Sequence, residues 1–164
     1  MGGDSIASSG SNRTIIAMPK VFRVNHEFLI GYTTSFRMGQ LLQYGFIPPA
    51  RKPECSIEEY MIMEFVEALR GRFKDAGFAK VTDNVEWGGT FLVGYSGRLF
   101  KIDSDYQVNE NAKGIDTCGY GGEVALAVLL ALPKIAPPVR IKRALEIAAE
   151  LSVYVAPPFV IEKL

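Results

Sequence analysis

The sequence predicts a single α+β domain over residues 1–164, built from stacked layers of strands and helices. Short β-branched and apolar runs fill the first part of the chain, and two stretches with helical periodicity follow. A second group of strands then leads to two further helices and a last strand. Strands and helices that occur in such groups are typical of layered α+β folds. The periodicity leaves open whether the layers number two or four.

Composition restricts the class of protein. The chain is 48% hydrophobic and 22% charged, and its 18 basic residues balance 18 acidic ones. A neutral chain gives no electrostatic reason to bind nucleic acid or an anionic membrane surface. The first residues resemble no signal peptide, and the longest apolar run, residues 124–132, is too short to span a bilayer. We therefore expect a soluble, cytoplasmic protein with no nucleic-acid or membrane partner.

The cysteines and the histidine bear on metal and redox chemistry. Cys55 and Cys118 lie far apart in the sequence, which favours two free thiols over a disulfide. The single histidine, His26, excludes a multi-histidine metal site and is expected to be solvated in a turn between strands. Asp103, Asp105 and Glu110 could hold a cation, but a solvated turn is the favoured interpretation.

The first part of the chain is expected to form strands separated by turns. Alternation and β-branched content place four strands there: residues 1–5, 14–17, 21–24 and 28–33. Residues 7–12 have the composition of a loop, and residues 25–27 form the turn of a hairpin. A helix from about Ser35 ends before Gly45, because Pro48 and Pro49 prevent its continuation.

The next helix has a clear start and end. Ser56 and Glu59 form a capping box, the helix runs to about Ala76, and Gly77 follows its last residue. Its apolar stripe is expected to consist of Ile57, Met61, Phe65, Ala68, Leu69 and Phe73.

The second half of the chain repeats this order of strands and helices. A polar loop over residues 78–89 precedes the expected strands, which are residues 90–95, 98–103, 107–109 and 114–119. Ser96 and Gly97 form a tight hairpin turn between the first two of these strands. A helix over residues 123–132 is apolar nearly all round, which predicts burial on more than one side. The last helix, residues 137–153, should turn one set of residues inward: Ile141, Ala144, Leu145, Ala148 and Leu151. A strand over residues 159–161 ends the chain.

Three segments near the amino terminus carry a resemblance to a known family. Met1-Gly-Gly-Asp-Ser5, Pro19-Lys-Val-Phe-Arg-Val24 and Phe28-Leu-Ile-Gly-Tyr32 resemble the active-site framework of the proteasome-type N-terminal nucleophile hydrolases. The resemblance is closest to HslV-like peptidases, the proteolytic subunits of the bacterial two-component ATP-dependent protease. Asp4 and Lys20 lie 16 residues apart, which is the spacing of that family.

Later segments extend the resemblance over most of the chain. Residues 90–100 are similar to the central hairpin of the family, and residues 118–127 to its Gly-Ser-Gly-Gly loop and following helix. Residues 143–164 are similar to the last helix and carboxyl-terminal strand of the bacterial peptidase. Residues 77–89 form an insertion relative to it. The implied fold is the αββα four-layer sandwich.

The resemblance implies peptide hydrolysis by an N-terminal threonine, whose own amine serves as the base. It assigns Lys20 to lowering the proton affinity of that amine and hydroxyl, Asp4 to holding the lysine, and Gly31 to donating a backbone amide to the oxyanion. Other readings stay open for each residue: a turn acid for Asp4, an exposed edge lysine for Lys20 and a strand bulge for Gly31. A lysine flanked by Pro19 and Val21 favours a buried partner.

This chain departs from the family pattern at two points. In the family, a strand that begins with the nucleophilic threonine precedes the Gly-Asp pair, whereas this chain opens at Met1, after that strand. The resemblance then implies a natural start further upstream at a threonine, the reading we favour, or a shortened and inactive member. At the glycine loop, Tyr120 stands where the family has an assisting serine.

The resemblance also implies a cation site and partners. Related subunits bind a monovalent cation such as Na⁺ through backbone carbonyls, and the matching positions are Ala149, Ser152 and Val155. No cofactor is required for the chemistry. The expected assembly is a homo-oligomeric ring that receives polypeptide substrate from a partner ATPase unfoldase.

The sequence therefore predicts a proteasome-like threonine-type endopeptidase subunit that is inactive as written, because the nucleophile is absent. The alternative is a non-catalytic structural or assembly protein that retains the same sandwich. An amidohydrolase of the same superfamily is a weaker reading, because the carboxyl-terminal segments resemble the protease branch.

Overall fold

The computed structural model of the chain describes residues 1–9 and 12–164, and the elements named below belong to that part. Its strands are β1 (Gly2–Gly3), β2 (Ile6–Ser9), β3 (Asn12–Ile15), β4 (Val21–Val24), β5 (Phe28–Tyr32), β6 (Lys80–Thr82), β7 (Val85–Trp87), β8 (Phe91–Tyr95), β9 (Arg98–Ile102), β10 (Val108–Glu110) and β11 (Val160–Ile161). Its α-helices are α1 (Phe36–Gln40), α2 (Ile57–Glu59), α3 (Val66–Asp75), α4 (Gly122–Ala131) and α5 (Pro137–Leu151). Two π-helical segments, η1 (Leu41–Gly45) and η2 (Tyr60–Phe65), continue α1 and α2.

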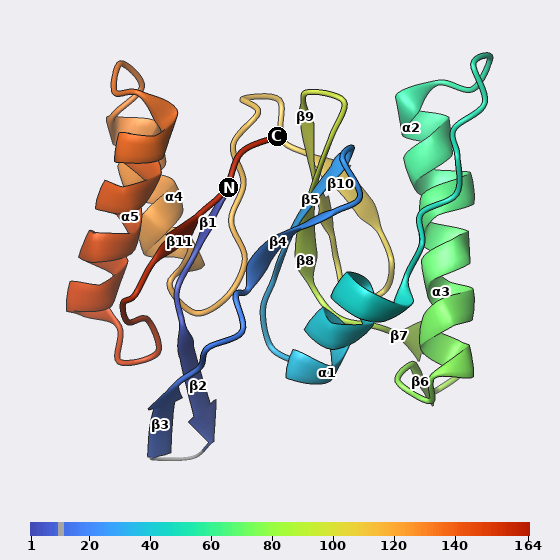
Figure 1. The fold of residues 1–164 in the computed structure, drawn as a ribbon, viewed down its shortest axis with the longest axis horizontal. Coiled ribbons are helices and arrows are strands. Elements are labelled where there is room, and N and C mark those ends of the chain that lie inside the picture. The colour runs from blue at the N-terminus through green and yellow to red at the C-terminus, as the bar shows by residue number, and fades with distance from the viewer. Residues whose placement is uncertain (10–11) are drawn as a thin grey trace.

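The elements form four layers, which confirms the αββα arrangement. Figure 1 shows α4 and α5 on one outer side, then β1 with β11, then the large sheet, and α1 to α3 on the other outer side. The large sheet has the strand order β10-β9-β8-β5-β4, and each neighbouring pair is antiparallel. The sheet beside α4 and α5 is much smaller than the five-stranded sheet, because it consists of β1 and β11 alone and each contributes only two residues.

The main core lies between the large sheet and the helices α1 to α3. Ile30 and Val93, which are paired across β5 and β8, are fully buried there, as is Phe65 from η2. Aromatic rings fill much of this space, and the rings of Phe28 and Tyr95 stack with their centroids 4.4 Å apart. This core holds the sheet rigid, and the sheet in turn positions the residues on its other face.

The helix that begins at Ser56 differs from the regular helix expected from its sequence. Its cap is confirmed, since the Ser56 hydroxyl accepts a hydrogen bond from the Glu59 amide. The π-helical turns of η2 then rotate the buried face, so that Tyr60 and Val66 are buried while Ala68 is exposed. The Tyr60 hydroxyl donates to the Pro49 carbonyl oxygen at 2.6 Å, which satisfies its polar end.

The second helical layer is less enclosed than the sequence suggests. α4 and α5 pack against each other through Ala125, Leu129 and Ala144, which form a small separate core. The expectation that α4 is buried on more than one side was wrong, because its Leu130 is 42% exposed. Leu151 was also expected to face inward, yet it is 72% exposed at the last turn of α5.

Three connecting segments also differ from expectation. The polar loop over residues 78–89 contains the hairpin β6–β7, and residues 7–9 of the expected loop belong to β2, which pairs with β3. Residues 10 and 11 of that loop lie outside the described residues. Residues 114–119 are irregular rather than a central strand, because hydrogen bonds within the segment and to Gly122 replace a strand ladder. None of the described helices is long and apolar enough to cross a membrane.

Candidate active site

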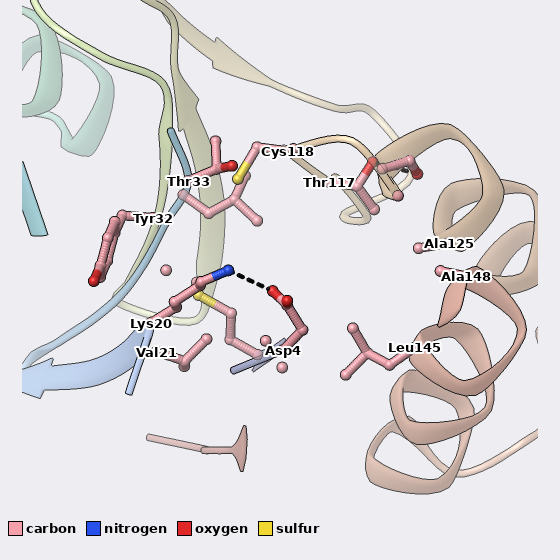
Figure 2. Close-up of a pocket in the computed structure, with 18 of the residues that line it drawn as sticks. Asp4, Lys20, Val21, Tyr32, Thr33, Thr117, Cys118, Ala125, Leu145 and Ala148 are labelled. Atoms are coloured by element: carbon pink, nitrogen blue, oxygen red, sulfur yellow. Dashed lines mark hydrogen bonds and ion pairs between the residues drawn. The ribbon is translucent and has the colours of Figure 1, made fainter. Parts of the chain in front are cut away.

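A cavity of about 650 Å³ separates the α4–α5 layer from the large sheet. β1 forms part of its floor, the segment 114–122 forms one end, and α4 and α5 form an apolar wall. Figure 2 shows this cavity with the Lys20 and Asp4 side chains projecting into it, across from Leu145 and Ala148 of α5. A pocket that combines an apolar wall with a few converging polar and charged groups is a feature of functional sites.

Lys20 and Asp4 form the charged centre of the cavity. The Lys20 ammonium lies 2.9 Å from Asp4 Oδ1, and their side chains are only 14% and 15% exposed. The other carboxylate oxygen of Asp4, Oδ2, accepts a hydrogen bond from the Ile6 amide at 3.0 Å. Because both oxygens are held, the carboxylate fixes where the ammonium lies.

The spacing of Asp4 and Lys20 follows from the hairpin between them. β2 and β3 pair from Ile6 opposite Ile15, and the Ile16 amide donates to the Ser5 carbonyl oxygen at 2.8 Å. The chain therefore leaves the cavity at Asp4, returns through the hairpin and re-enters at Lys20, at the start of β4.

Gly31 lies beside this pair, in the middle of β5. It is opposite Val21 of β4 on one side and Leu92 of β8 on the other. Its α-carbon faces the Met1 side chain so closely that a Cβ there would lie 2.4 Å from the Met1 sulfur. Gly31 is therefore a lining residue of the cavity, and its amide belongs to a strand that is paired along both edges.

Tyr120 lies at the edge of the cavity, on the turn that precedes α4. Its ring is 80% exposed and packs against the ring of Tyr154, with centroids 4.6 Å apart. The preceding Gly119 has a φ of 95°, and a Cβ there would approach Thr33 Oγ1 to 2.9 Å. The turn therefore brings the segment 117–120 against the end of β5.

Several residues that line the cavity were not predicted from the sequence. Thr33 and Thr34 follow β5, and Cys118 lies opposite them; Figure 2 shows Thr33 and Cys118 side by side. Thr34 has a φ of 71°, a left-handed conformation that is rare for a β-branched residue. The run of hydroxyl residues directly after an apolar strand, residues 33–35, was the signal available in the sequence.

Cys118 does not have the character of a nucleophile. Burial is the main cause that raises the pKa of its thiol to about 12, and the nearby Asp116 and Asp103 add to the shift against the opposing effect of two lysines. The residue as a whole is half-buried, yet the sulfur environment strongly disfavours a thiolate. Both cysteines are free thiols in the structure, as predicted.

The chain terminus closes one side of the cavity. The Met1 amine donates to the Glu162 carbonyl oxygen at 2.7 Å, and the Glu162 amide donates back to the Met1 carbonyl oxygen at 2.9 Å. These bonds extend the pairing of β1 with β11. Burial lowers the pKa of the Met1 amine, and the Glu162 carboxylate partly opposes that shift.

The three positions expected to bind a cation lie at the carboxyl-terminal end of α5. Ala149 is in its last turns, Ser152 is its carboxyl cap, and the Val155 amide donates to the Ser152 carbonyl oxygen at 3.2 Å. Carbonyl oxygens gather at such a helix end, where the helix dipole favours positive charge. Their chemistry is compatible with a hard monovalent cation.

The other candidate cation ligands are used in internal bonds. The described residues contain no group of three or more His, Cys, Asp or Glu side chains that could hold a metal ion. Asp103 accepts from the Asn109 amide, Asp105 accepts from the Gln107 backbone amide, and Glu110 pairs with Arg98. His26 is exposed, as expected for a turn residue.

Comparisons with known proteins identify the same architecture. No family model and no curated protein matches the chain. Among solved structures, BPH from Thiobacillus denitrificans is similar with a TM-score of 0.76 and 17% identity, over 97% of this chain and 88% of that chain. It has also been solved in complex with epoxomicin. HslV from Trypanosoma brucei is similar with a TM-score of 0.67 and 20% identity, over 98% of this chain and 90% of that chain. Anbu, the ancestral beta-subunit, from Yersinia bercovieri has a TM-score of 0.60 and 14% identity, over 96% of this chain and 73% of that chain.

These likenesses agree with the observed layers and with the expectation from the sequence. The chain has the αββα fold of the proteasome-type N-terminal nucleophile hydrolases.

Proposed function

We propose that this chain forms the body of a proteasome-like threonine-type endopeptidase subunit. The Lys20–Asp4 ion pair, held inside the cavity between two layers, is the observation that carries the proposal. An ammonium group in this position lowers the proton affinity of an amine or hydroxyl beside it, because a second positive charge there is unfavourable. Asp4 keeps the ammonium in place.

We further propose that an additional strand, upstream of Met1 in the natural protein, brings the nucleophilic threonine into the cavity. The geometry of the inner layer supports this proposal. β1 and β11 are short, while the apolar side chains of Ile141 and Leu145 on α5 line open space beside them. A strand laid along this space would bury more of that apolar wall and widen the small sheet formed by β1 and β11.

The proposed reaction is peptide hydrolysis in two steps. The threonine hydroxyl attacks the scissile carbonyl carbon while its own amine takes the hydroxyl proton. The peptide C–N bond then breaks, and the leaving amine receives that proton. Water hydrolyses the resulting ester and regenerates the threonine. Lys20 assists by lowering the proton affinity of the attacking group.

Two further residues keep proposed roles at this site. Gly31 is proposed to help stabilise the oxyanion through its backbone amide, and Tyr120 to contribute a hydrogen bond in place of the family serine. Tyr120 is 80% exposed and its ring stacks on Tyr154, so no contact in the structure holds its hydroxyl at the Lys20–Asp4 pair. This observation supports the alternative, a non-catalytic structural or assembly protein with the same fold.

The assembly and its partners are also proposals. HslV and Anbu share this fold, and we propose by analogy that this chain forms a ring that encloses its active sites. A partner ATPase would deliver unfolded polypeptide to that ring in the cytoplasm. A monovalent cation at the carbonyls of Ala149, Ser152 and Val155 would stabilise the end of α5.

The test compares this chain with a form extended to an upstream in-frame threonine whose amino terminus is verified by mass spectrometry. Cleavage of fluorogenic peptides and inhibition by epoxomicin are measured for both. We expect activity only in the extended form, lost in Lys20→Ala and retained in Lys142→Ala, which removes an exposed lysine from the solvent side of α5. A folded extended protein that is inactive and does not react with the inhibitor would contradict the peptidase proposal and leave the non-catalytic alternative.

A further inference from the structure

A second, more open pocket shares no lining residue with the cavity described above. It has a volume of about 330 Å³ and is lined by the helix formed by α1 and η1, by α3, and by the segment that precedes β4. Arg37, Gln40 and Tyr44 line it from one face of the first helix, at helical spacing. Arg72 of α3 and Met18 complete the lining on the other sides.

The two arginines in this pocket have no acidic partner. Neither guanidinium forms an ion pair within the described residues, and no acidic side chain lines the pocket. Six of the nine ion pairs found in the structure involve an arginine, so arginines elsewhere in this chain do find carboxylates. Two unpaired guanidinium groups at one concave surface repel each other and attract anions.

Arg72 adds a specific unsatisfied donor. Its Nε atom is buried and has no hydrogen-bond partner in the described structure. A buried donor without a partner costs stability unless a bound group satisfies it. The guanidinium lies directly over Gly45: a Cβ at that glycine would stand 2.9 Å from Nη2 and 3.1 Å from Nε.

The backbone around the pocket is also unusual. Gly45 is the last residue of η1, a π-helical segment, and such segments occur frequently at functional sites. The absence of a side chain at Gly45 lets the Arg72 guanidinium approach the helix end, so that Arg72 and Arg37 line the same pocket. A simpler role for Arg72 is to cap the free carbonyls at this helix end. That role does not account for Arg37, which lines the same pocket without an acidic partner.

We infer that this pocket binds a phosphate group of a small molecule, such as inorganic phosphate or a phosphate monoester. Two guanidinium groups, the Gln40 amide and the Tyr44 hydroxyl supply more donors than the two oxygens of a carboxylate can use, whereas a tetrahedral phosphate presents enough acceptors. The volume suits a small phosphate compound rather than a large cofactor. The pocket shares no lining residue with the cavity that holds Lys20 and Asp4, so it is separate from the proposed peptidase centre. Figure 1 shows α1 and α3, which contribute to it, on the other side of the large sheet from α4 and α5.

The test is a titration of the full chain with inorganic phosphate at constant ionic strength. Binding is measured by calorimetry and by the shift in thermal unfolding. We expect saturable binding of phosphate and much weaker binding of acetate. Arg37→Gln, at an exposed residue whose loss leaves the core intact, should weaken phosphate binding by about tenfold, as should Arg72→Gln, because each removes one charge-assisted interaction. Gly45→Ala should weaken it with both charges retained, because the new methyl group displaces the Arg72 guanidinium.

Lys134→Gln is the matched control, since it removes one exposed positive charge from the segment between α4 and α5, and it should bind phosphate as the unmodified chain does. Equal binding of phosphate and acetate would contradict the proposed ligand class. Phosphate binding that is absent, or that is unchanged in Arg37→Gln, would overturn the proposal and leave Arg72 as a helix cap. Arg37→Gln alone decides this point if Arg72→Gln fails to fold.

Discussion

The Met1 side chain occupies the space that a side chain at position 31 would need. A Cβ on Gly31 would lie 2.4 Å from the Met1 sulfur, while the next nearest group other than Met1, a methyl of Val21, would be at an ordinary contact distance of 3.4 Å. The obstruction comes from the far end of a flexible chain, and the space beyond it is cavity. Gly31 is therefore constrained by a side chain that can move.

We predict that Gly31→Ala changes the free energy of unfolding by less than about 1 kcal/mol, because Met1 can rotate into the cavity. Gly39→Ala is the matched comparison. A Cβ at Gly39 would lie 2.2 to 2.5 Å from three atoms of the buried Tyr32 ring, which cannot retreat. That variant should lose about 1–3 kcal/mol despite the better helix propensity of alanine.

Urea denaturation of both variants measures the difference. Equal losses would mean that the Met1 side chain is as rigidly held as the Tyr32 ring.

The ion pair at the centre of the cavity makes a second prediction. Lys20→Met leaves the Asp4 carboxylate in a largely buried site with only the Ile6 amide as partner, and we expect a loss of about 2 kcal/mol in the free energy of unfolding. Asp4→Asn keeps an acceptor for that amide but leaves the Lys20 ammonium without its counter-charge, so we expect a loss of similar size. The double variant should be more stable than the sum of the two single losses implies.

A double-mutant cycle by chemical denaturation gives the coupling directly. Strictly additive losses would show that the two side chains contribute independently, in spite of their 2.9 Å separation.

The sequence predicted the parts of this site that depend on local order along the chain. The strands around Asp4 and Lys20 and the cap of the helix at Ser56 follow from local sequence signals. The hairpin that places Asp4 and Lys20 was predicted only as a loop between two strands. The family resemblance supplied the four-layer arrangement, which periodicity alone could not separate from a two-layer one.

The rest of the site depends on contacts between distant segments. Thr33 and Cys118 line the same cavity because the turn at Gly119 packs on the end of β5. No local pattern in either segment predicts that contact. The segment 114–119 has the composition of a buried strand, yet its polar groups bond within the segment and to Gly122 instead. The rotation of the buried face at Tyr60 likewise follows from a π-helical turn, which hydrophobic periodicity does not detect.

Thr34 offers a test of local strain at the edge of the cavity. Its φ of 71° is unfavourable for a β-branched residue and natural for glycine. We predict that Thr34→Gly raises the free energy of unfolding by about 1 kcal/mol, since relief of strain outweighs the added flexibility of the unfolded chain. Thr33→Gly is the control, because Thr33 has no such φ, and it should lower stability. Destabilisation by both variants would mean that Thr34 makes contacts worth more than its strain.

The cation site proposed at the end of α5 predicts a response to monovalent cations. If Ala149, Ser152 and Val155 bind Na⁺, the melting temperature in sodium chloride should exceed that in choline chloride at equal ionic strength, because a ligand that binds only the folded state stabilises it. The increase should saturate with sodium concentration. Identical melting curves in the two salts would remove the cation from the proposal.

Cys118 makes a prediction about stability at alkaline pH. Burial raises the pKa of its thiol from the ordinary 9.0 to about 12 in the folded protein. Above pH 9 the unfolded chain therefore releases a proton that the folded chain keeps, so the stabilisation is complete below pH 9 and is lost as pH rises towards 12. Between pH 8 and pH 10 this one group should lower the free energy of unfolding by about 1 kcal/mol. Cys118→Ala should lack this pH dependence. The difference in free energy of unfolding between the two proteins, measured by urea denaturation, should therefore narrow from pH 8 to pH 10.

The native thiol should also resist alkylation at pH 8 and react once urea unfolds the chain. Rapid alkylation of the folded protein at pH 8 would show instead that Cys118 is an accessible thiolate, and would make it a candidate nucleophile beside Lys20.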